Sequence, residues 1–422
     1  MAQYSKSWHA QYTDGVKKFF EILLAVVIFL VPTNLFLVLT EVNSRVHGLR
    51  VDYLLPKLYL SDILIGAATV VGLVVYKKTL IPAFKRLLKN QTFQISGVFF
   101  VLFSVFQLTL QIPILSVWLL AKLLLFTLFF AVAWQLKTKI PSKVSIFAVA
   151  ATIMLQSLVG IYQFGMQKSL AGYWFLGETN ISSFAGLAKT THGGIEKVLP
   201  YGTTAHPNVL GGVLAVYLLI YLQLSTKPNS AVLGLGLCCL LLTQSFSALL
   251  VFMFGLLWLF LQNKPARKLI VALYVTALLV VPLLLPFWKT SNASITRRGY
   301  LSVAGWQMFV ANPVAGVGVG AFTSQVEKYS PTKEVVRFVQ PAHHVGILLL
   351  AEIGLVGILT IVTIVYKLYS KKTHHFLLQT LGYAALLSLP LLVLDHYVYT
   401  LQSGQLLLVI LLLWCGRRSE TW

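Results

Sequence analysis

The residues best suited to chemistry gather in one polar interval of the chain, residues 291–357. In chain order this interval contains Arg297, Arg298, His343, His344 and Glu352. An arginine fork matches the oxygens of a phosphate and keeps its charge at any physiological pH. A histidine can take up or release a proton near neutral pH. Two cations and two histidines beside an apolar segment therefore predict a site for an anionic ligand carried by a lipid.

The same residues also have plain structural explanations. Interfacial arginines commonly contact lipid headgroups, and a histidine at the start of a helix can simply cap it. Glu352 lies about two turns inside an apolar segment, where a carboxylate is costly unless it faces a cavity or a partner. It is either a site residue or a structural one, bonded to a neighbouring helix. Asp62 and Lys122 are similar charges in apolar runs, and Lys122 could pair with either acid.

Further polar candidates adjoin other apolar runs. His206 and Asn208 flank the proline that begins a run at about residue 208, and proline is well tolerated in a first helical turn. Asn208 either caps this helix or contacts a headgroup sugar. Asp395, in Asp395-His396-Tyr397, either orients a histidine, binds a sugar hydroxyl or caps a helix end.

The glycine-rich run Gly316-Val317-Gly318-Val319-Gly320 superficially resembles a dinucleotide-binding loop. No strand precedes it and no βαβ unit surrounds it, so the context excludes that function. Glycine permits positive φ, and the run predicts a tight turn. Upstream, residues 300–311 predict a short interfacial helix, because Leu301, Ala304 and Met308 give it an apolar stripe.

The composition determines which elements must position these residues. The chain is 57% hydrophobic and 11% charged, so it has too little polar surface to cover a soluble globule. Its apolar runs are continuous and long enough to cross a hydrocarbon core as helices. The net charge of +21 is explained by Lys and Arg in cytoplasmic loops, so a lipid bilayer and no nucleic acid is the expected partner. These observations predict an all-α polytopic membrane protein.

About twelve transmembrane helices are expected in a single integral membrane domain, residues 1–422. The predicted spans are 19–40, 58–76, 93–110, 114–136, 144–164, 208–224, 231–242, 247–261, 269–288, 345–366, 376–394 and 404–414.

Basic residues alternate between the loops and assign the orientation. Their bias places the N- and C-termini in the cytoplasm of a protein of the cytoplasmic (inner or plasma) membrane. A large extracytoplasmic loop, residues 289–344, then lies between spans 9 and 10, so the active site is expected on the extracytoplasmic face. This orientation requires 231–242 and 247–261 to be two short spans with a break between them.

Several short motifs follow one another along the second half of the chain. They are Gly202 to Gly211 with its His206-Pro207-Asn208, Thr243-Gln244-Ser245, Arg298, Asn312-Pro313 through Phe322, and His343 followed by Ala351-Glu352-Ile353-Gly354 and Gly357. Taken together, residues 202–416 resemble the O-antigen ligase and O-antigen polymerase family. The twelve-span layout with a large late outer loop is also similar.

This resemblance implies a membrane glycosyltransferase of the GT-C type. Such enzymes take a glycan from a polyprenyl diphosphate, such as undecaprenyl diphosphate, and transfer it to a hydroxyl of a glycan, lipid or protein acceptor. The donor is already activated, so the resemblance implies neither a metal nor another cofactor, and a single displacement inverts the sugar carbon. It assigns His343 and Arg298 as catalytic. Arg298, with Arg297 and Arg337, is expected to bind the diphosphate.

Two departures from the family pattern bear on this assignment. The family's asparagine after the histidine is His344 here, and its arginine after the serine is Phe246. Arg45, Arg50 or Arg337 could supply the missing charge. Two alternative functions remain open at this point: a transporter or flippase for lipid-linked sugars or small anions, and a non-catalytic scaffold for envelope assembly.

Overall fold

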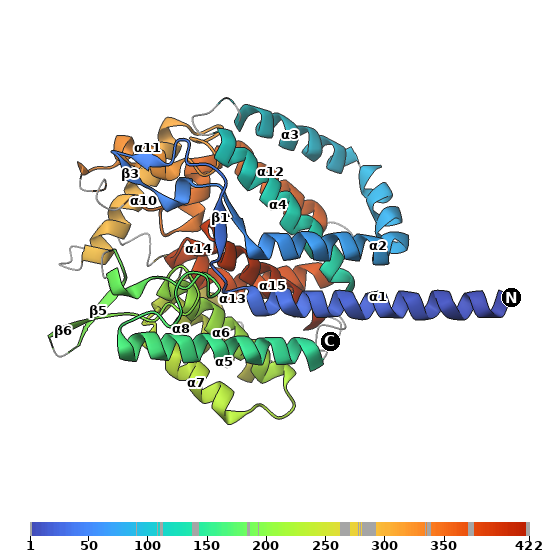
Figure 1. Ribbon diagram of the computed structural model, residues 1–422. Coiled ribbons are helices and arrows are strands. Elements are labelled where there is room, and N and C mark those ends of the chain that lie inside the picture. The colour runs from blue at the N-terminus through green and yellow to red at the C-terminus, as the bar shows by residue number, and fades with distance from the viewer. Residues whose placement is uncertain are drawn as a thin grey trace.

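The protein is a bundle of helices with a few short strands in its loops (Figure 1). The computed structural model describes residues 2–418 except 90, 108, 110–112, 137–142, 184–185, 193, 262–270, 277, 279, 281–292, 334, 336–338 and 370–374. The helices are α1 (Ala2–Leu30), α2 (Leu60–Leu88), α3 (Gln91–Gln107), α4 (Pro113–Ala133), α5 (Lys143–Met166), α6 (Pro207–Leu224), α7 (Ser230–Leu242), α8 (Phe246–Phe260), α10 (Ala293–Ala311), α11 (Phe322–Tyr329), α12 (Val345–Tyr369), α13 (His375–Leu394), α14 (Tyr397–Thr400) and α15 (Gln402–Arg418).

Most predicted spans coincide with a helix to within a few residues, although most of the expected span 269–288 lies outside the described residues. Five described helices, α2, α4, α5, α6 and α12, are long and apolar enough to cross a membrane, and several shorter apolar helices accompany them. Large apolar side chains such as Phe147 and Leu124 remain 72% and 60% exposed on these helices. A soluble protein rarely exposes such continuous apolar faces. The chain is therefore an integral membrane protein.

The fold was expected to be all-α, but the described residues also include three two-stranded antiparallel sheets. They pair β1 (Phe36–Val38) with β4 (Lys57–Tyr59), β2 (Arg45–Val46) with β3 (Leu49–Arg50), and β5 (Lys189–His192) with β6 (Ile195–Val198). The predicted span 19–40 is consequently too long, since α1 ends at Leu30. The helix ends just before Pro32, which disfavours a helical conformation at the preceding residue. Beyond it, the amide of Asn34 bonds to the carbonyls of Leu176 and Thr203, both at 3.0 Å, which holds the chain outside the helix.

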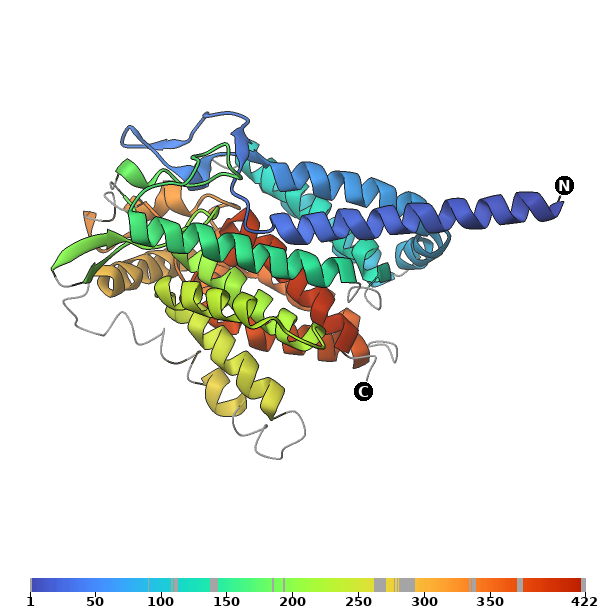
Figure 2. The same cartoon turned by 60° about the horizontal axis from the view of Figure 1, so that its bottom comes forward.

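The polar segments gather at one end of the bundle. Figures 1 and 2 show α10, α11 and the β5–β6 hairpin at the end opposite the start of α1 and the end of α15. Both terminal helices thus point their free ends in the same direction, as an even number of crossings requires.

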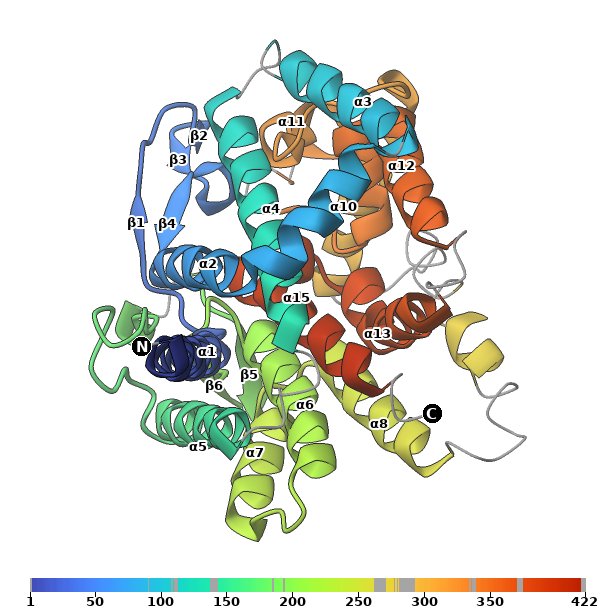
Figure 3. The ribbon, with the colours of Figure 1, turned by 90° about the vertical axis from the view of Figure 1, so that its right-hand side faces the viewer.

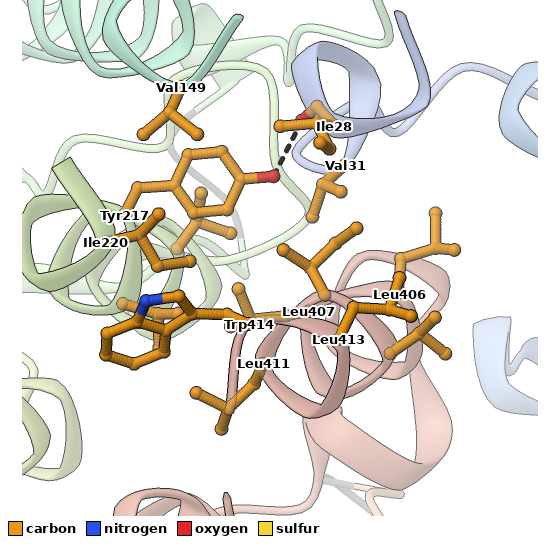
Figure 4. Packing of buried hydrophobic residues seen from close by; sticks show 14 of the residues in the cluster. Ile28, Val31, Val149, Tyr217, Ile220, Leu406, Leu407, Leu411, Leu413 and Trp414 are labelled. Carbon is orange, nitrogen blue, oxygen red and sulfur yellow. Dashed lines mark hydrogen bonds between the residues drawn. The ribbon is translucent and has the colours of Figure 1, made fainter. Parts of the chain in front are cut away.

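The buried core lies around α6 and α15. Figure 3 shows α15 near the middle of the bundle, with α4, α6 and α13 around it. Figure 4 shows Trp414 of α15 beside Ile220 of α6, in one large cluster of buried apolar residues that also contains Leu411. Within this cluster the Tyr217 hydroxyl donates to the carbonyl oxygen of Ile28 at 2.6 Å, which ties α6 to α1.

The predicted break between α7 and α8 is present. The α7 helix ends at Leu242, Gln244 has a positive φ of 52°, and Ser245 caps α8. Gly211 of α6 faces this junction, where an added Cβ would come within 2.9 Å of the Ser245 Cβ. The junction between α7 and α8 therefore packs so closely against α6 that position 211 has room only for glycine.

The α10 helix differs from the short interfacial helix that was expected. It begins at Ala293 and not near residue 300, so Arg297 and Arg298 lie inside the helix. Its stripe of Leu301, Ala304 and Met308 is fully buried against α11 and α12 and does not face lipid as expected. The opposite side leaves Trp306 54% exposed and Val310 61% exposed. The α11 helix, against which the stripe packs, was not predicted from the sequence.

The glycine-rich run forms the expected turn, and it also hydrogen-bonds to α12 at a point where that helix is interrupted. Gly354 has φ 57° and ψ −164°, so α12 is interrupted there. The amides of Val317 and Gly318 donate to the carbonyls of Ala351 and Glu352 at 2.9 and 3.0 Å. Beyond the break, Leu355 donates to the carbonyl of Pro313 at 2.8 Å. The turn therefore supplies hydrogen bonds that an interrupted helix would otherwise lack.

One buried ion pair joins α2 to α4. Lys122 Nζ lies 3.3 Å from Asp62 Oδ2, and the two side chains are 9% and 3% exposed. Asp62 also accepts from Gln402 Nε2 at 2.7 Å and from the amide of Tyr59 at 2.9 Å. Lys122 thus pairs with Asp62 and not with Glu352, which answers the question that the sequence left open.

Candidate functional site

A cluster of polar side chains forms where α6, α10, α12 and α13 end or begin. We call it the His–Arg cluster, and its members are His206, Asn208, Arg298, His343, Asp395 and His396. These residues come from four segments far apart in the sequence. Five of the six were site candidates from sequence alone.

Arg298 is held in place by the end of α13. Its Nη1 donates to the carbonyl oxygen of Leu394 at 3.0 Å, and its Nε is buried with no hydrogen-bond partner in the described structure. A guanidinium offers five donor hydrogens in a fixed fork, so this contact leaves others available. Arg298 thus presents a positive charge to the cluster with donor capacity to spare.

Asp395 follows Leu394 directly and is 4% exposed. Its Oδ2 accepts from Asn208 Nδ2 at 2.6 Å, and its Oδ1 accepts from the amide of His396 at 3.0 Å. Burial raises the pKa of this carboxyl, while the Arg298 charge and these hydrogen bonds oppose the rise. Asp395 links the start of α6 to the end of α13.

The pKa of His343 is affected by four other residues in or near the cluster. Its Nδ1 is buried without a hydrogen-bond partner in the described structure. Its ring stands edge-on to that of His396, with centroids 4.9 Å apart. Burial, and then the proximity of His396 and the positive charge of Arg298, hold the pKa of His343 well below its usual value. The imidazole is therefore neutral at physiological pH, and one of its ring nitrogens can accept a hydrogen bond.

The other two histidines are also kept neutral. Burial lowers the pKa of His396 to about 3 and that of His206 to about 4, and Arg298 lowers both further. His206 Nδ1 accepts from the amide of Asn208 at 3.1 Å, which caps α6. His206 therefore holds its proton on Nε2.

Three members of the cluster have the donor types of a metal site. His343, Asp395 and His396 each offer an atom, and the three atoms lie within 4.8 Å of one another. Imidazole and carboxylate are common ligands of zinc and iron. The same spacing also suits a water oxygen that bonds to all three groups, or a hydroxyl oxygen that bonds to two of them. The fixed charge of Arg298 disfavours a cation at this position, which makes the oxygen the better fit.

Two other sequence candidates have structural partners. Glu352 Oε2 accepts from the Tyr399 hydroxyl at 2.8 Å, and Oε1 accepts from the amide of Phe322 at 3.3 Å. His344 Nδ1 accepts from the amide of Ile347 at 3.3 Å and caps α12. Both residues support the segments that carry the cluster.

The remaining arginines are distributed differently. The charge of Arg297 reaches His343, so it lies near the cluster. Arg50 belongs to β3 and pairs with Glu41 at 3.3 Å. Arg337 lies outside the described residues. Phe246, at the family's arginine position, is the first residue of α8 and is 68% exposed.

One member of the cluster, His396, and two of its neighbours, Tyr53 and Thr400, were not predicted as site residues. The ring of Tyr53 stands edge-on to that of His396 at 5.4 Å, and Thr400 Oγ1 lies 2.7 Å from His396 Nδ1. His396 and Thr400 are four residues apart, a spacing that places both on one face of a helix. That spacing was the available signal for this pair. The position of Tyr53 depends on how its loop folds over the bundle, and no local pattern predicts it.

Comparison with known proteins finds a similarity in the middle of the chain. The sequence model of the family described as O-Antigen ligase matches residues 231–362, from α7 to the middle of α12. This segment is therefore similar to that family, and it includes Arg298, His343 and Glu352. No curated protein matches the chain.

Proposed function

We propose that the protein is a membrane glycosyltransferase that moves a glycan from a polyprenyl diphosphate to an acceptor hydroxyl. The observation that carries this proposal is the position of Arg298, whose anchored guanidinium lies beside neutral histidines and a buried carboxylate. A reaction with an anionic leaving group and a hydroxyl nucleophile needs a fixed cation and a proton acceptor side by side. The similarity of residues 231–362 to the O-antigen ligase family supports the same chemistry.

Arg298 would stabilise the leaving diphosphate. As the bond between the sugar carbon and the diphosphate oxygen breaks, negative charge grows on that oxygen. A guanidinium already oriented by the Leu394 carbonyl needs little rearrangement to meet this charge. Arg297 adds positive potential on the same helix. Arg337 stays a candidate for the same role from sequence alone.

His343 would orient or deprotonate the acceptor hydroxyl. Its unpartnered, buried Nδ1 and its lowered pKa suit a group that meets a hydroxyl while neutral. Attack from the side opposite the leaving diphosphate gives inversion at the sugar carbon. The products are the glycosylated acceptor and a free polyprenyl diphosphate.

The membrane setting suits a lipid-borne donor. The apolar outer faces of the helices give a polyprenyl chain a hydrocarbon environment, while the His–Arg cluster lies at the polar end of the bundle. The bias of basic residues assigns this end to the extracytoplasmic side. The acceptor class, whether glycan, lipid or protein, stays open within this proposal.

Transport of the lipid-linked sugar is less well supported. A solute path would use the intramembrane charges, yet Asp62 is paired with Lys122 and Glu352 is bonded to Tyr399. A scaffold without catalysis is favoured by one observation, Phe246 at the position of the family's arginine. We therefore retain the scaffold as the second candidate.

Transfer in detergent distinguishes these functions. Purified protein in micelles, which have no compartments, is mixed with a polyprenyl-diphosphate glycan and candidate acceptors. Our proposal requires release of polyprenyl diphosphate together with acceptor glycosylation. Binding of the donor without turnover, with every acceptor class offered, would leave the scaffold as the function. Absence of both in micelles, with movement of the donor across proteoliposomes, would identify a transporter.

A further inference from the structure

The second histidine of the cluster has a defined protonation pattern. His396 Nδ1 lies 2.7 Å from Thr400 Oγ1, and the same Oγ1 lies 3.1 Å from the carbonyl oxygen of His396. A hydroxyl has one proton, and a carbonyl oxygen can only accept. Both contacts are hydrogen bonds at the same time only if Thr400 donates to the carbonyl and His396 Nδ1 donates to Thr400. A neutral imidazole with its proton on Nδ1 carries its lone pair on Nε2.

Three groups of the cluster can meet at one atom. One ring nitrogen of His343, one of His396 and one oxygen of Asp395 lie within 4.8 Å of one another. Three points no farther apart than this can all be reached from a common point about 2.8 Å away, the usual length of a hydrogen bond to a hydroxyl oxygen. His343 Nδ1, buried and unpartnered, indicates that part of the cluster's bonding capacity is unused.

From this geometry we propose that His396 is a second catalytic residue, which takes the proton of the acceptor hydroxyl while His343 holds that hydroxyl in place. This inference rests on the proposed function and assigns separate roles within the same site. The hydroxyl donates to Nε2 of His396, and its oxygen accepts from the ring N–H of His343. Thr400 acts as a positioning residue, because it keeps the lone pair of His396 on Nε2.

The step is balanced without a metal or a redox partner. The oxygen of the acceptor forms a bond to the sugar carbon as its O–H bond breaks and the proton moves to His396. The bond from the sugar carbon to the diphosphate oxygen breaks, and its electron pair leaves with the diphosphate. The carboxylate of Asp395, which has an oxygen within 4.8 Å of a ring nitrogen of His396, favours the imidazolium that forms there. Release of this proton to water or to the diphosphate returns the His396 imidazole to its neutral form.

His396→Asn tests the assignment of the proton acceptor. The amide nitrogen of asparagine occupies nearly the position of Nδ1 and can still donate to Thr400, but Nε2 is removed. We expect acceptor glycosylation to fall by about 100-fold or more, the usual contribution of a proton-transfer group. Binding of the polyprenyl diphosphate to the detergent-solubilised protein should stay within about twofold of wild type, since Arg298 is unchanged. His47→Asn, at an exposed histidine of the β2–β3 turn, is the control.

Thr400→Val tests the role of the tautomer. Valine has the shape of threonine without the hydroxyl, so the Nδ1 proton is no longer fixed. We expect a fall in the maximal rate of about 10-fold with little change in the acceptor KM or in thermal stability.

Each outcome of these experiments decides one point. His396→Asn with wild-type transfer would overturn the assignment of His396, as would loss of donor binding in that variant, which would indicate a structural role. Loss of wild-type activity after dialysis against a chelator, with recovery on adding zinc, would mean that the three groups bind a cation. Failure of the wild-type protein to transfer to any acceptor would overturn the proposed function itself.

Discussion

The guanidinium of Arg298 is bonded to the carbonyl oxygen of Leu394, the residue immediately before Asp395. This contact fixes a cation from α10 beside a carboxylate from the end of α13. A cation and an anion that are both held by backbone contacts keep their separation, which a pair of flexible surface side chains does not. The positive end of the cluster is therefore oriented before any ligand binds.

Replacing Arg298 with alanine should abolish transfer. The loss of a charge that stabilises the leaving diphosphate is expected to lower the rate by about 100- to 1,000-fold. Arg298→Lys should recover only a small part, because an ammonium lacks the planar fork that holds two phosphate oxygens in fixed directions while it stays bonded to the Leu394 carbonyl. Release of polyprenyl diphosphate in micelles is the measurement, and Arg86→Ala, in the last turn of α2, is the matched control. Full activity of Arg298→Ala would remove Arg298 from the site.

The two neighbouring histidines should respond differently to substitution. His343→Ala removes a group of the cluster and should lower transfer by at least about 100-fold with normal membrane insertion. His344→Asn should be tolerated, since an asparagine oxygen can accept from the amide of Ile347 as His344 does. Complementation and transfer in micelles measure both variants. Inactivity of His344→Asn, with activity in His343→Ala, would mean that His344 is the working histidine.

Glycine is required where the loop meets α12. An added Cβ at Gly316 would lie 2.5 Å from the carbonyl oxygen of Glu352, and one at Gly354 would lie 2.6 Å from the carbonyl oxygen of Val314. Both positions also have positive φ. Gly316→Ala and Gly354→Ala should each lower stability by about 2 kcal/mol or more. The thermal midpoint in detergent measures this, with Gly234→Ala as control because nothing lies within 4 Å of its Cβ position. Equal midpoints for all three variants would contradict the requirement.

The buried pair of Lys122 and Asp62 should show strong coupling. Lys122→Met leaves an uncompensated carboxylate that is 3% exposed and should cost about 3–5 kcal/mol. The double variant with Asp62→Asn should recover a large part of this loss, because no buried charge remains. Lys78→Met, at an exposed position of α2, serves as control. Additive effects of the two single substitutions would show that the pair is not energetically coupled.

The buried histidines should make the folded protein sensitive to acid. Their folded-state pKa values are lowered, to about 4 in His206 and about 3 in His396, below the unfolded value of about 6.5. Between these values the unfolded chain binds more protons, so stability is complete above pH 6.5 and falls as pH decreases towards 4. Each histidine contributes a slope of up to about 1.4 kcal/mol per pH unit. Protonation of Asp395, whose pKa is raised, partly opposes this fall at the acid end.

The thermal midpoint between pH 7 and pH 4 measures this dependence. His396→Asn should have a shallower slope than wild type, because it lacks one of the titrating groups. Identical slopes in the wild type and in His396→Asn would mean that His396 does not contribute to the acid sensitivity.

The helices were predictable because a continuous apolar run has one stable conformation in a bilayer. The start of α10 and the break in α12 were not, since both depend on contacts with residues distant in sequence. For the candidate site, residue type and motif spacing selected Arg298 and His343, and both lie in the His–Arg cluster. Their catalytic roles stay predictions. The partner of Lys122 depends on which helices touch, and residue types alone do not determine that.

The interruption of α12 has a consequence for how the protein is made. The two halves of this helix are joined through the loop that contains Gly316 and Val317, which is synthesised before them. Until that loop occupies the gap, the peptide groups around Gly354 lack partners in a medium that offers none. Insertion into the membrane and tertiary assembly therefore cannot be separate stages for this segment. The α12 helix reaches its final form only once the preceding loop has folded back into the bilayer beside it.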